Sequence, residues 1–206
     1  MKVNGNQRKR AQGFTLIEMI GVLAVIAILA SMLIPKIFEA INSSRINNAA
    51  VSYNAMKTAV MDHYGKYGSI TSSNGVAFTA AQLANYDKQV LLAESLSDKP
   101  FVVKIGDGGA GTLVRVVAMA ATAAVDGTNP QYDLDGDTVS DTGGSGNLVE
   151  AVITGVAAAD ALELSHRLDG ITLSAANTTV QDFLGRVKYA TPVAGLTDVH
   201  IYIAHR

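Results

Sequence analysis

The longest apolar stretch of the chain runs from Phe14 to Ile34, and only one of its 21 residues, Glu18, is ionisable. A helix rises about 1.5 Å per residue, so this stretch is long enough to cross a hydrocarbon core of about 30 Å. The pattern therefore predicts a transmembrane helix over residues 14–34.

Apolar residues continue beyond this segment at helical steps of three and four. Such steps keep one apolar stripe on a helix, so we expect a single helix from Phe14 to Tyr64, broken only by Pro35. Proline lacks a backbone donor and favours a kink or local melting, and Gly21 is a second soft point. The stripe consists of Ile34, Ile37, Phe38, Ile41, Ala49, Tyr53, Met56, Val60 and Tyr64.

Gly65 and Gly68 are expected to end this helix, and residues 65–206 are numerous enough for one hydrophobic core. Their pattern predicts a long helix packed on an antiparallel sheet, an α+β fold. Thr79 is a plausible N-cap for the first helix of this part. We expect helices over Phe78–Leu96 and Ala157–Leu168. Strands are expected over Phe101–Ile105, Thr112–Met119, Asn147–Val156, Val187–Ala190 and Val199–Ala204, the first two joined by the glycine-rich residues 106–111.

Charge and cysteine content narrow the class of protein. The net charge is −2, but Lys2, Arg8, Lys9 and Arg10 place four positive charges in a leader, Met1–Gln12, that has no acid. Basic residues on one side of a span predict a cytoplasmic leader and an external body. The acidic body gives no indication of nucleic-acid binding. Without cysteine, disulfides are excluded, so an external body must secure its loops in another way.

A secretory signal peptide or a plain membrane anchor would also account for the basic leader and the apolar span. Neither explains Glu18, because a charge inside a membrane segment costs a few kcal/mol and usually marks a function. A partner for Glu18 would arise if the chain were cut after Gly13, since Phe14 would then carry a free amino group.

The residues Gly13-Phe14-Thr15-Leu16-Ile17-Glu18 resemble the class III signal of type IV prepilins and type II secretion pseudopilins. The resemblance runs through Pro35 and, more loosely, to Tyr64, about a quarter of the chain. It implies that a prepilin peptidase cuts after Gly13 and methylates the amine of Phe14. It also implies that Glu18 serves subunit assembly and that Pro35 softens the helix.

The resemblance implies three regions: a leader (1–13), a long helix (14–64) and a periplasmic or extracellular head (65–206). It implies a structural subunit stored in the inner membrane and then assembled into a pilus or a secretion pseudopilus. The partners would be the prepilin peptidase, copies of the chain, related pilin-like subunits and an inner-membrane assembly platform. The competing hypothesis is a membrane-anchored binding module that does not polymerise.

Catalysis is not indicated, because His63, His166, His200 and His205 are scattered and share no motif with an acid or a serine nucleophile.

An acidic run in the head is the one candidate for metal chemistry. Asp133, Asp135, Asp137 and Asp141 alternate as do the oxygen ligands in the first half of a calcium loop. The full template fails, since Thr138 and Gly144 stand where glycine and glutamate are required; Glu150 is a possible ligand from outside. We expect either a Ca²⁺ site or a solvated acidic turn. No cofactor is otherwise required.

Overall fold

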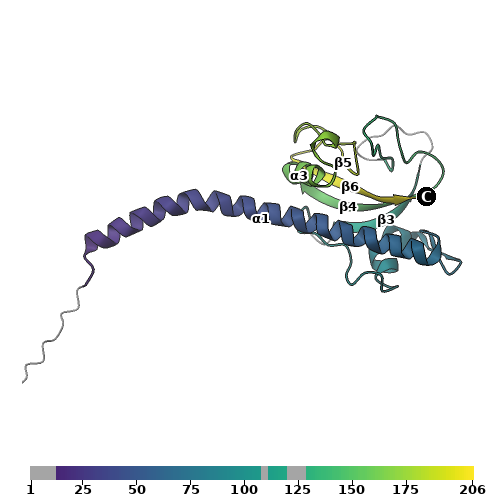
Figure 1. Cartoon of the computed structure of the whole chain (residues 1–206), viewed down its shortest axis with the longest axis horizontal. Helices are drawn as coiled ribbons and strands as arrows, with labels where there is room; N and C mark the ends of the chain where they lie inside the picture. The colour runs from purple at the N-terminus through teal and green to yellow at the C-terminus, as the bar shows by residue number, and fades with distance from the viewer. Residues whose placement is uncertain (1–12, 108–110, 120–128) are drawn as a thin grey trace, which may run out of the picture. The chain divides into compact units, whose positions relative to one another are not determined.

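The computed structural model describes residues 13–107, 111–119 and 129–206 (Figure 1). The chain divides into two compact units, residues 1–41 and 42–206. The long helix α1 (Leu16–Tyr67) contributes to both. Of the predicted leader (1–13), residues 1–12 lie outside the described residues, and only Gly13 is described.

Helix α1 differs from the prediction at both ends and at Pro35. It continues through Gly65 and ends at Tyr67, and the next residue, Gly68, has a φ of +68°, a conformation that glycine adopts without strain. The expected break at Pro35 is wrong as far as helical structure goes, because α1 runs on through this residue. Proline removes only one hydrogen bond, and the turns on either side retain theirs. The roles of Pro35 and Gly21 as points of bending remain predictions.

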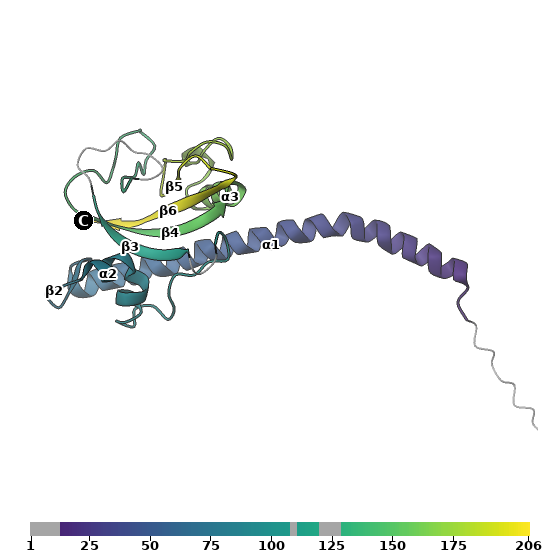
Figure 2. The same ribbon diagram turned by 180° about the vertical axis from the view of Figure 1, so that it is seen from behind.

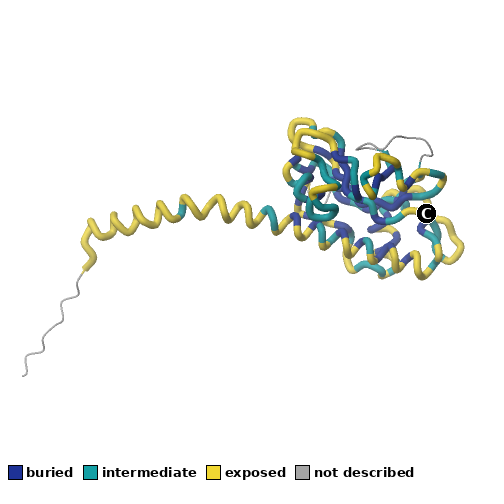
Figure 3. Tube along the Cα trace, turned by 45° about the horizontal axis from the view of Figure 1, so that its top comes forward, coloured by how far each residue is buried: buried dark blue, intermediate teal, exposed yellow. Residues whose placement is uncertain are grey.

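The described part of unit 1 has no core of its own. From Gly13 to Ile41 every residue is exposed except the half-buried Ala30. The large apolar side chains between Phe14 and Ile34 are 47–81% exposed. Figure 3 shows this stretch as an almost unbroken run of exposed residues. It contains the segment of α1 that is long and apolar enough to cross a membrane.

Unit 2 is built on a four-stranded antiparallel sheet with the order β3-β4-β6-β5 (Figure 2). Side chains of α1 pack into the same core as the strands, including Ile46, Tyr53 and Val60, which are fully buried. The fold is α+β, as predicted. The strands are β3 (Thr112–Ala118), β4 (Asn147–Ala157), β5 (Val187–Tyr189) and β6 (Leu196–His205), and they are accompanied by helix α3 (Ala158–Leu168) and a short 3-10 turn, η3 (Ile171–Leu173).

The helix predicted over Phe78–Leu96 is shorter and split. Thr79 caps α2 (Ala80–Ala84) in a reciprocal capping box with Gln82, which confirms the predicted N-cap. A π-helical turn, η1 (Asp87–Leu91), follows. Before α2 lies a two-stranded hairpin of β1 (Ser72–Ser73) and β2 (Val76–Ala77), which the sequence analysis did not predict.

The strand predicted over Phe101–Ile105 is wrong. Its alternating apolar side chains are buried in the core, but the segment is not paired as a strand. The buried carboxylate of Asp87 instead accepts the backbone N–H groups of Phe101 (2.9 Å) and Val114 (3.1 Å). The Asp87 carboxylate thus accepts N–H groups that would otherwise pair the two predicted strands, and the predicted hairpin does not form.

Candidate assembly site at the start of the long helix

The predicted cleavage signal lies just before α1. Gly13, Phe14 and Thr15 have no regular secondary structure, and Phe14 is 81% exposed. No other part of the described structure comes within 4 Å of the position where a Cβ on Gly13 would lie. Among the described residues, none beyond its chain neighbours crowds Gly13, the residue before the predicted cut.

Glu18 and Thr15 form a capping box at the start of α1. One carboxylate oxygen of Glu18 accepts the backbone N–H of Thr15 at 2.8 Å and its hydroxyl at 2.7 Å. The hydroxyl oxygen of Thr15 in turn accepts the Glu18 N–H at 3.3 Å. This box satisfies donors that the first turn of a helix leaves free.

Thr15 is the functional residue that the sequence analysis missed, although the Thr-x-x-Glu spacing was a signal for it. No cationic side chain forms a salt bridge with Glu18 among the residues that the structure describes. The carboxylate thus has a local hydrogen-bond partner but no opposite charge.

One open, largely apolar groove along α1 brings several predicted residues together. Phe14, Glu18 and Gly21 line it, whereas Pro35 does not. Glu18 contributes the only ionisable side chain among the lining residues, which also include Val22, Val25 and Ile26. The start of α1 therefore presents a single carboxylate within an apolar surface that another helix could cover.

The acidic run lies in a loop that we define as residues 131–142, the acidic loop. Carboxylate oxygens of Asp133, Asp135 and Asp141 lie within 4.8 Å of one another, whereas Asp137 is not part of this group. Asp137 accepts the Val139 N–H at 2.8 Å instead. The predicted four-residue ligand set is thus reduced to three.

The backbone of the acidic loop retains one feature of the calcium template. Thr138 has a φ of +71°, the left-handed conformation for which glycine is required at that position of the template. The buried carboxylate of Asp133 accepts the N–H groups of Gly136 (2.7 Å) and Thr138 (2.8 Å). Glu150, considered as an outside ligand, is not part of the group of three carboxylates, and its oxygens accept hydrogen bonds from Arg115 on β3 and from Tyr132 in the loop.

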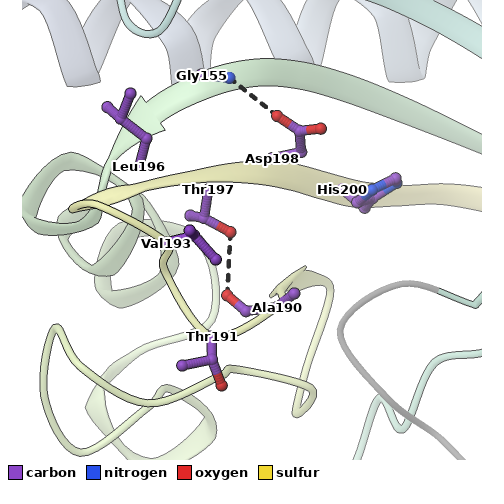
Figure 4. Close-up of a pocket in the computed structure, with 8 residues that line it drawn as sticks. All are labelled: Gly155, Ala190, Thr191, Val193, Leu196, Thr197, Asp198 and His200. Atoms are coloured by element: carbon purple, nitrogen blue, oxygen red, sulfur yellow. Dashed lines mark hydrogen bonds between the residues drawn. The ribbon is translucent and has the colours of Figure 1, made fainter.

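A pocket beside the end of β6 is shown in Figure 4. Both of its ionisable groups have partners: Asp198 accepts the Gly155 N–H at 2.9 Å, and His200 Nδ1 lies 3.3 Å from Glu150. Thr197 donates its hydroxyl to the Ala190 carbonyl at 3.0 Å. The polar groups at this pocket therefore stabilise the turn and the sheet and do not converge on a reacting atom.

Two histidines have acidic partners that the sequence analysis did not foresee. His63 Nδ1 lies 2.8 Å from Glu94, and His200 contacts Glu150. Both imidazoles are largely buried, with side-chain exposures of 0% and 12%. The partners are 31 and 50 residues away in sequence, so no local motif announced them.

A family model described as the prokaryotic N-terminal methylation motif matches residues 8–34. No solved structure matches this chain. The matched range includes Gly13, Phe14, Thr15 and Glu18 and ends where the apolar span ends. The chain thus carries the prepilin-type signal of type IV pilin-like precursors, and its apolar helix fits a membrane-anchored precursor.

Proposed function

We propose that this chain is a structural subunit that is cleaved after Gly13, N-methylated at Phe14 and assembled into a helical filament. The observation that carries the proposal is the combination, at the start of α1, of an exposed apolar segment with a carboxylate that has no salt-bridge partner among the described residues. Catalysis of a reaction by the head is no part of the proposal.

Hydrolysis of the Gly13–Phe14 bond supplies the missing charge. It frees an α-amino group on Phe14, four positions from Glu18, and methylation keeps that amine cationic. In a stack of helices the amine of one copy reaches Glu18 of a neighbour. Forming this ion pair adds little net stability, but removing one partner leaves the other charge unpaired in an apolar site, at a cost of about 3–5 kcal/mol. Glu18 therefore sets the register between copies.

The apolar surface around Glu18 supplies the cohesion. The large side chains from Phe14 to Ile34 are at least 47% exposed in the isolated chain and need either lipid or neighbouring helices around them. Extraction from the membrane becomes favourable only when other copies replace the lipid. The partners are thus further copies, related pilin-like subunits, an inner-membrane assembly platform and the prepilin peptidase.

The orientation follows from the leader charge. Lys2, Arg8, Lys9 and Arg10 precede the span, so the leader faces the cytoplasm and the head lies outside the inner membrane. The assembled filament is a cell-surface pilus or a periplasmic secretion pseudopilus.

Substitution of Glu18→Ala tests the proposal, with Glu39→Ala as the matched control. Glu39 lies on the same helix and forms an exposed salt bridge with Lys36. Both variants should be cleaved and methylated, as intact-mass and N-terminal analysis will show, but only Glu18→Ala should lose filaments in electron microscopy of sheared material. Normal filaments from Glu18→Ala would refute the register role.

The test also separates the competing function. A binding module that does not polymerise would keep an uncut or unmethylated N-terminus and form no filaments in either variant or in the wild type. That result would replace the filament proposal with a membrane-anchored binding function.

We also propose a structural Ca²⁺ in the acidic loop, held by Asp133, Asp135 and Asp141. The support is their mutual proximity, with oxygens within 4.8 Å, and the hard oxygen chemistry that calcium prefers. Bound Ca²⁺ would relieve repulsion among these three carboxylates and order the exposed side of the loop.

A further inference from the structure

The acidic loop packs on the sheet in a chain that has no cysteine. Three consecutive residues at its start, Gln131, Tyr132 and Asp133, are at most 1% exposed, whereas Asp135, Asp137 and Asp141 are exposed. An irregular segment can be buried in this way only if its polar groups find partners. The N–H of Tyr132 is bound within the loop, by the Thr142 hydroxyl at 2.8 Å. The Tyr132 hydroxyl and the Gln131 carbonyl find their partners among side chains of the sheet.

Glu150 on β4 is the centre of these contacts. Its side chain is 1% exposed, and its Oε1 accepts two hydrogen bonds from the Arg115 guanidinium on β3, at 2.8 and 2.6 Å. Its Oε2 accepts the hydroxyl of Tyr132 at 2.8 Å. Arg115 and Glu150 face each other in the register of the two strands, so the sheet itself holds the carboxylate in place.

Lys188 on β5 makes the second attachment. It is fully buried, and its ammonium donates to the backbone carbonyl of Gln131 at 2.9 Å. The same ammonium lies 4.3 Å from the centre of the Tyr132 ring, within the range of a cation–π contact. Tyr202 on β6 packs against that ring at 5.5 Å between centroids. Each of the four strands thus contributes to the surface on which the loop rests.

We call Arg115, Glu150 and Lys188 the charged lock. We propose that the charged lock holds the acidic loop on the sheet through Gln131 and Tyr132, and that it does so without help from a cation. It takes the part that a disulfide plays in many external domains of this size. The lock acts at the start of the loop, whereas a cation would act on the carboxylates that follow.

The physical reason is the cost of taking a hydrogen bond away from a buried charge. Glu150 and Lys188 are both secluded from water, so opening the loop removes a hydrogen bond from each of them at once. Because the carboxylate, the ammonium and the guanidinium come from three different strands, the lock is already assembled when the loop docks. Docking is therefore cooperative.

Tyr132→Phe is the most direct test, because it removes only the hydroxyl that reaches Glu150. Tyr189→Phe is a matched control: Tyr189 is an equally buried tyrosine of the same sheet whose hydroxyl has no hydrogen-bond partner among the described residues. Amide hydrogen exchange is measured on the full chain in detergent micelles. We expect residues 131–142 to exchange about tenfold faster in Tyr132→Phe, with β4 and the control unchanged.

Two results would overturn the proposal. One is unchanged protection of the acidic loop in Tyr132→Phe; the other is an equal increase in the loop and in β4, which indicates global destabilisation. A stronger variant, Glu150→Gln, should raise loop exchange further than Tyr132→Phe, whereas Glu163→Gln, at an exposed ion pair with Arg167, should not.

A chelator separates the lock from the proposed Ca²⁺. With excess EDTA, the wild-type chain should keep slow exchange at Gln131 and Tyr132, even if the amides from Leu134 to Asp141 exchange faster. Release of the whole loop by EDTA alone would identify the cation as the fastener and contradict the proposal.

Discussion

Glu18 and Glu150 are both glutamates in predominantly apolar elements, yet their surroundings are opposite. Glu18 is exposed, and its side-chain hydrogen bonds go to Thr15, three residues away. Glu150 is buried and contacts Arg115, Tyr132 and His200, which lie 18–50 residues away. The head completes its polar network from its own side chains, whereas the start of α1 provides half of a network.

The apolar residues of the two regions differ in the same way. In the head, Val149, Ile153 and Ile201 are fully buried, whereas the apolar residues of the span remain exposed. A region that leaves both its charge and its apolar surface unsatisfied has to be completed by lipid or by other protein chains. The head therefore carries its own packed core, and the proposed contacts between copies fall on the span.

Removing each carboxylate gives the largest expected contrast. Glu150→Ala leaves the buried Tyr132 hydroxyl and the half-buried Arg115 without their shared partner, and should lower the free energy of unfolding of the head by about 3–5 kcal/mol. Glu18→Ala should change it by less than about 0.5 kcal/mol, because the hydrogen bonds of the Glu18 carboxylate go to Thr15 in the same exposed turn. Chemical denaturation of the full chain in micelles, followed by circular dichroism, measures both; equal losses would break the comparison.

The part of the molecule that could be predicted is the part governed by neighbours in sequence. The span, the cleavage signal and the Thr79 cap all depend on residues within a few positions of one another. The strands β3 and β6 were found because the alternation of buried and more exposed residues along them is regular. Thr15 could have been found too, because its capping box has a local spacing.

The errors arose where a distant residue decided the outcome. The alternating apolar residues of Phe101–Ile105 fit a strand, but Asp87, 14 residues before Phe101, takes the backbone donor. The charged lock depends on the pairing of β3 with β4 and of β5 with β6, which no local pattern specifies. Glu150 was considered as a metal ligand because its acidity was visible and its partner Arg115, 35 residues away, was not.

Acid titration tests the lock with a smaller effect. Burial opposes ionisation of Glu150, but the hydrogen bonds and charges of His200, Arg115 and Tyr132 outweigh it and lower its pKa to about 2. A folded-state pKa below the unfolded value of 4.5 gives stability that is present above pH 4.5 and lost as the pH falls towards 2. The loss amounts to at most about 3 kcal/mol.

The matched measurement is the difference between the wild type and Glu150→Gln across this pH range. Burial raises the pKa of Asp169 and Asp182, so their contributions have the opposite sign, and the difference removes them. Only the wild type should carry the additional loss between pH 4.5 and pH 2. Parallel curves for the two proteins would show that Glu150 is not held ionised in the folded head.

The acidic loop combines the two situations of Glu18 and Glu150, because Asp135 and Asp141 are exposed and Asp133 is buried. Calcium removal tests this group. If the loop binds Ca²⁺, EDTA should lower the unfolding temperature by roughly 2–4 °C, the shift that about 1 kcal/mol gives in a domain of this size. Asp135→Asn with Asp141→Asn should abolish the response, and the exposed Asp62→Asn should keep it. A wild type that is insensitive to EDTA refutes the site.

The smallest expected effect is on the stability of the cap at the start of α1. It separates the capping of the helix by Glu18 from the proposed pairing of its charge in assembly. The same capping box occurs twice, as Thr15 with Glu18 and as Thr79 with Gln82, whose neutral Oε1 accepts the Thr79 N–H at 2.9 Å. Glu18→Gln should therefore keep the cap within about 0.5 kcal/mol, whereas Thr15→Ala should lose about 1 kcal/mol, seen as faster exchange of the Glu18 amide. Since the side-chain carboxamide of glutamine is neutral and cannot pair with the amine of a neighbouring copy, Glu18→Gln should still fail to form filaments. Filaments at wild-type yield would mean that the cap, and not the charge, is what assembly requires.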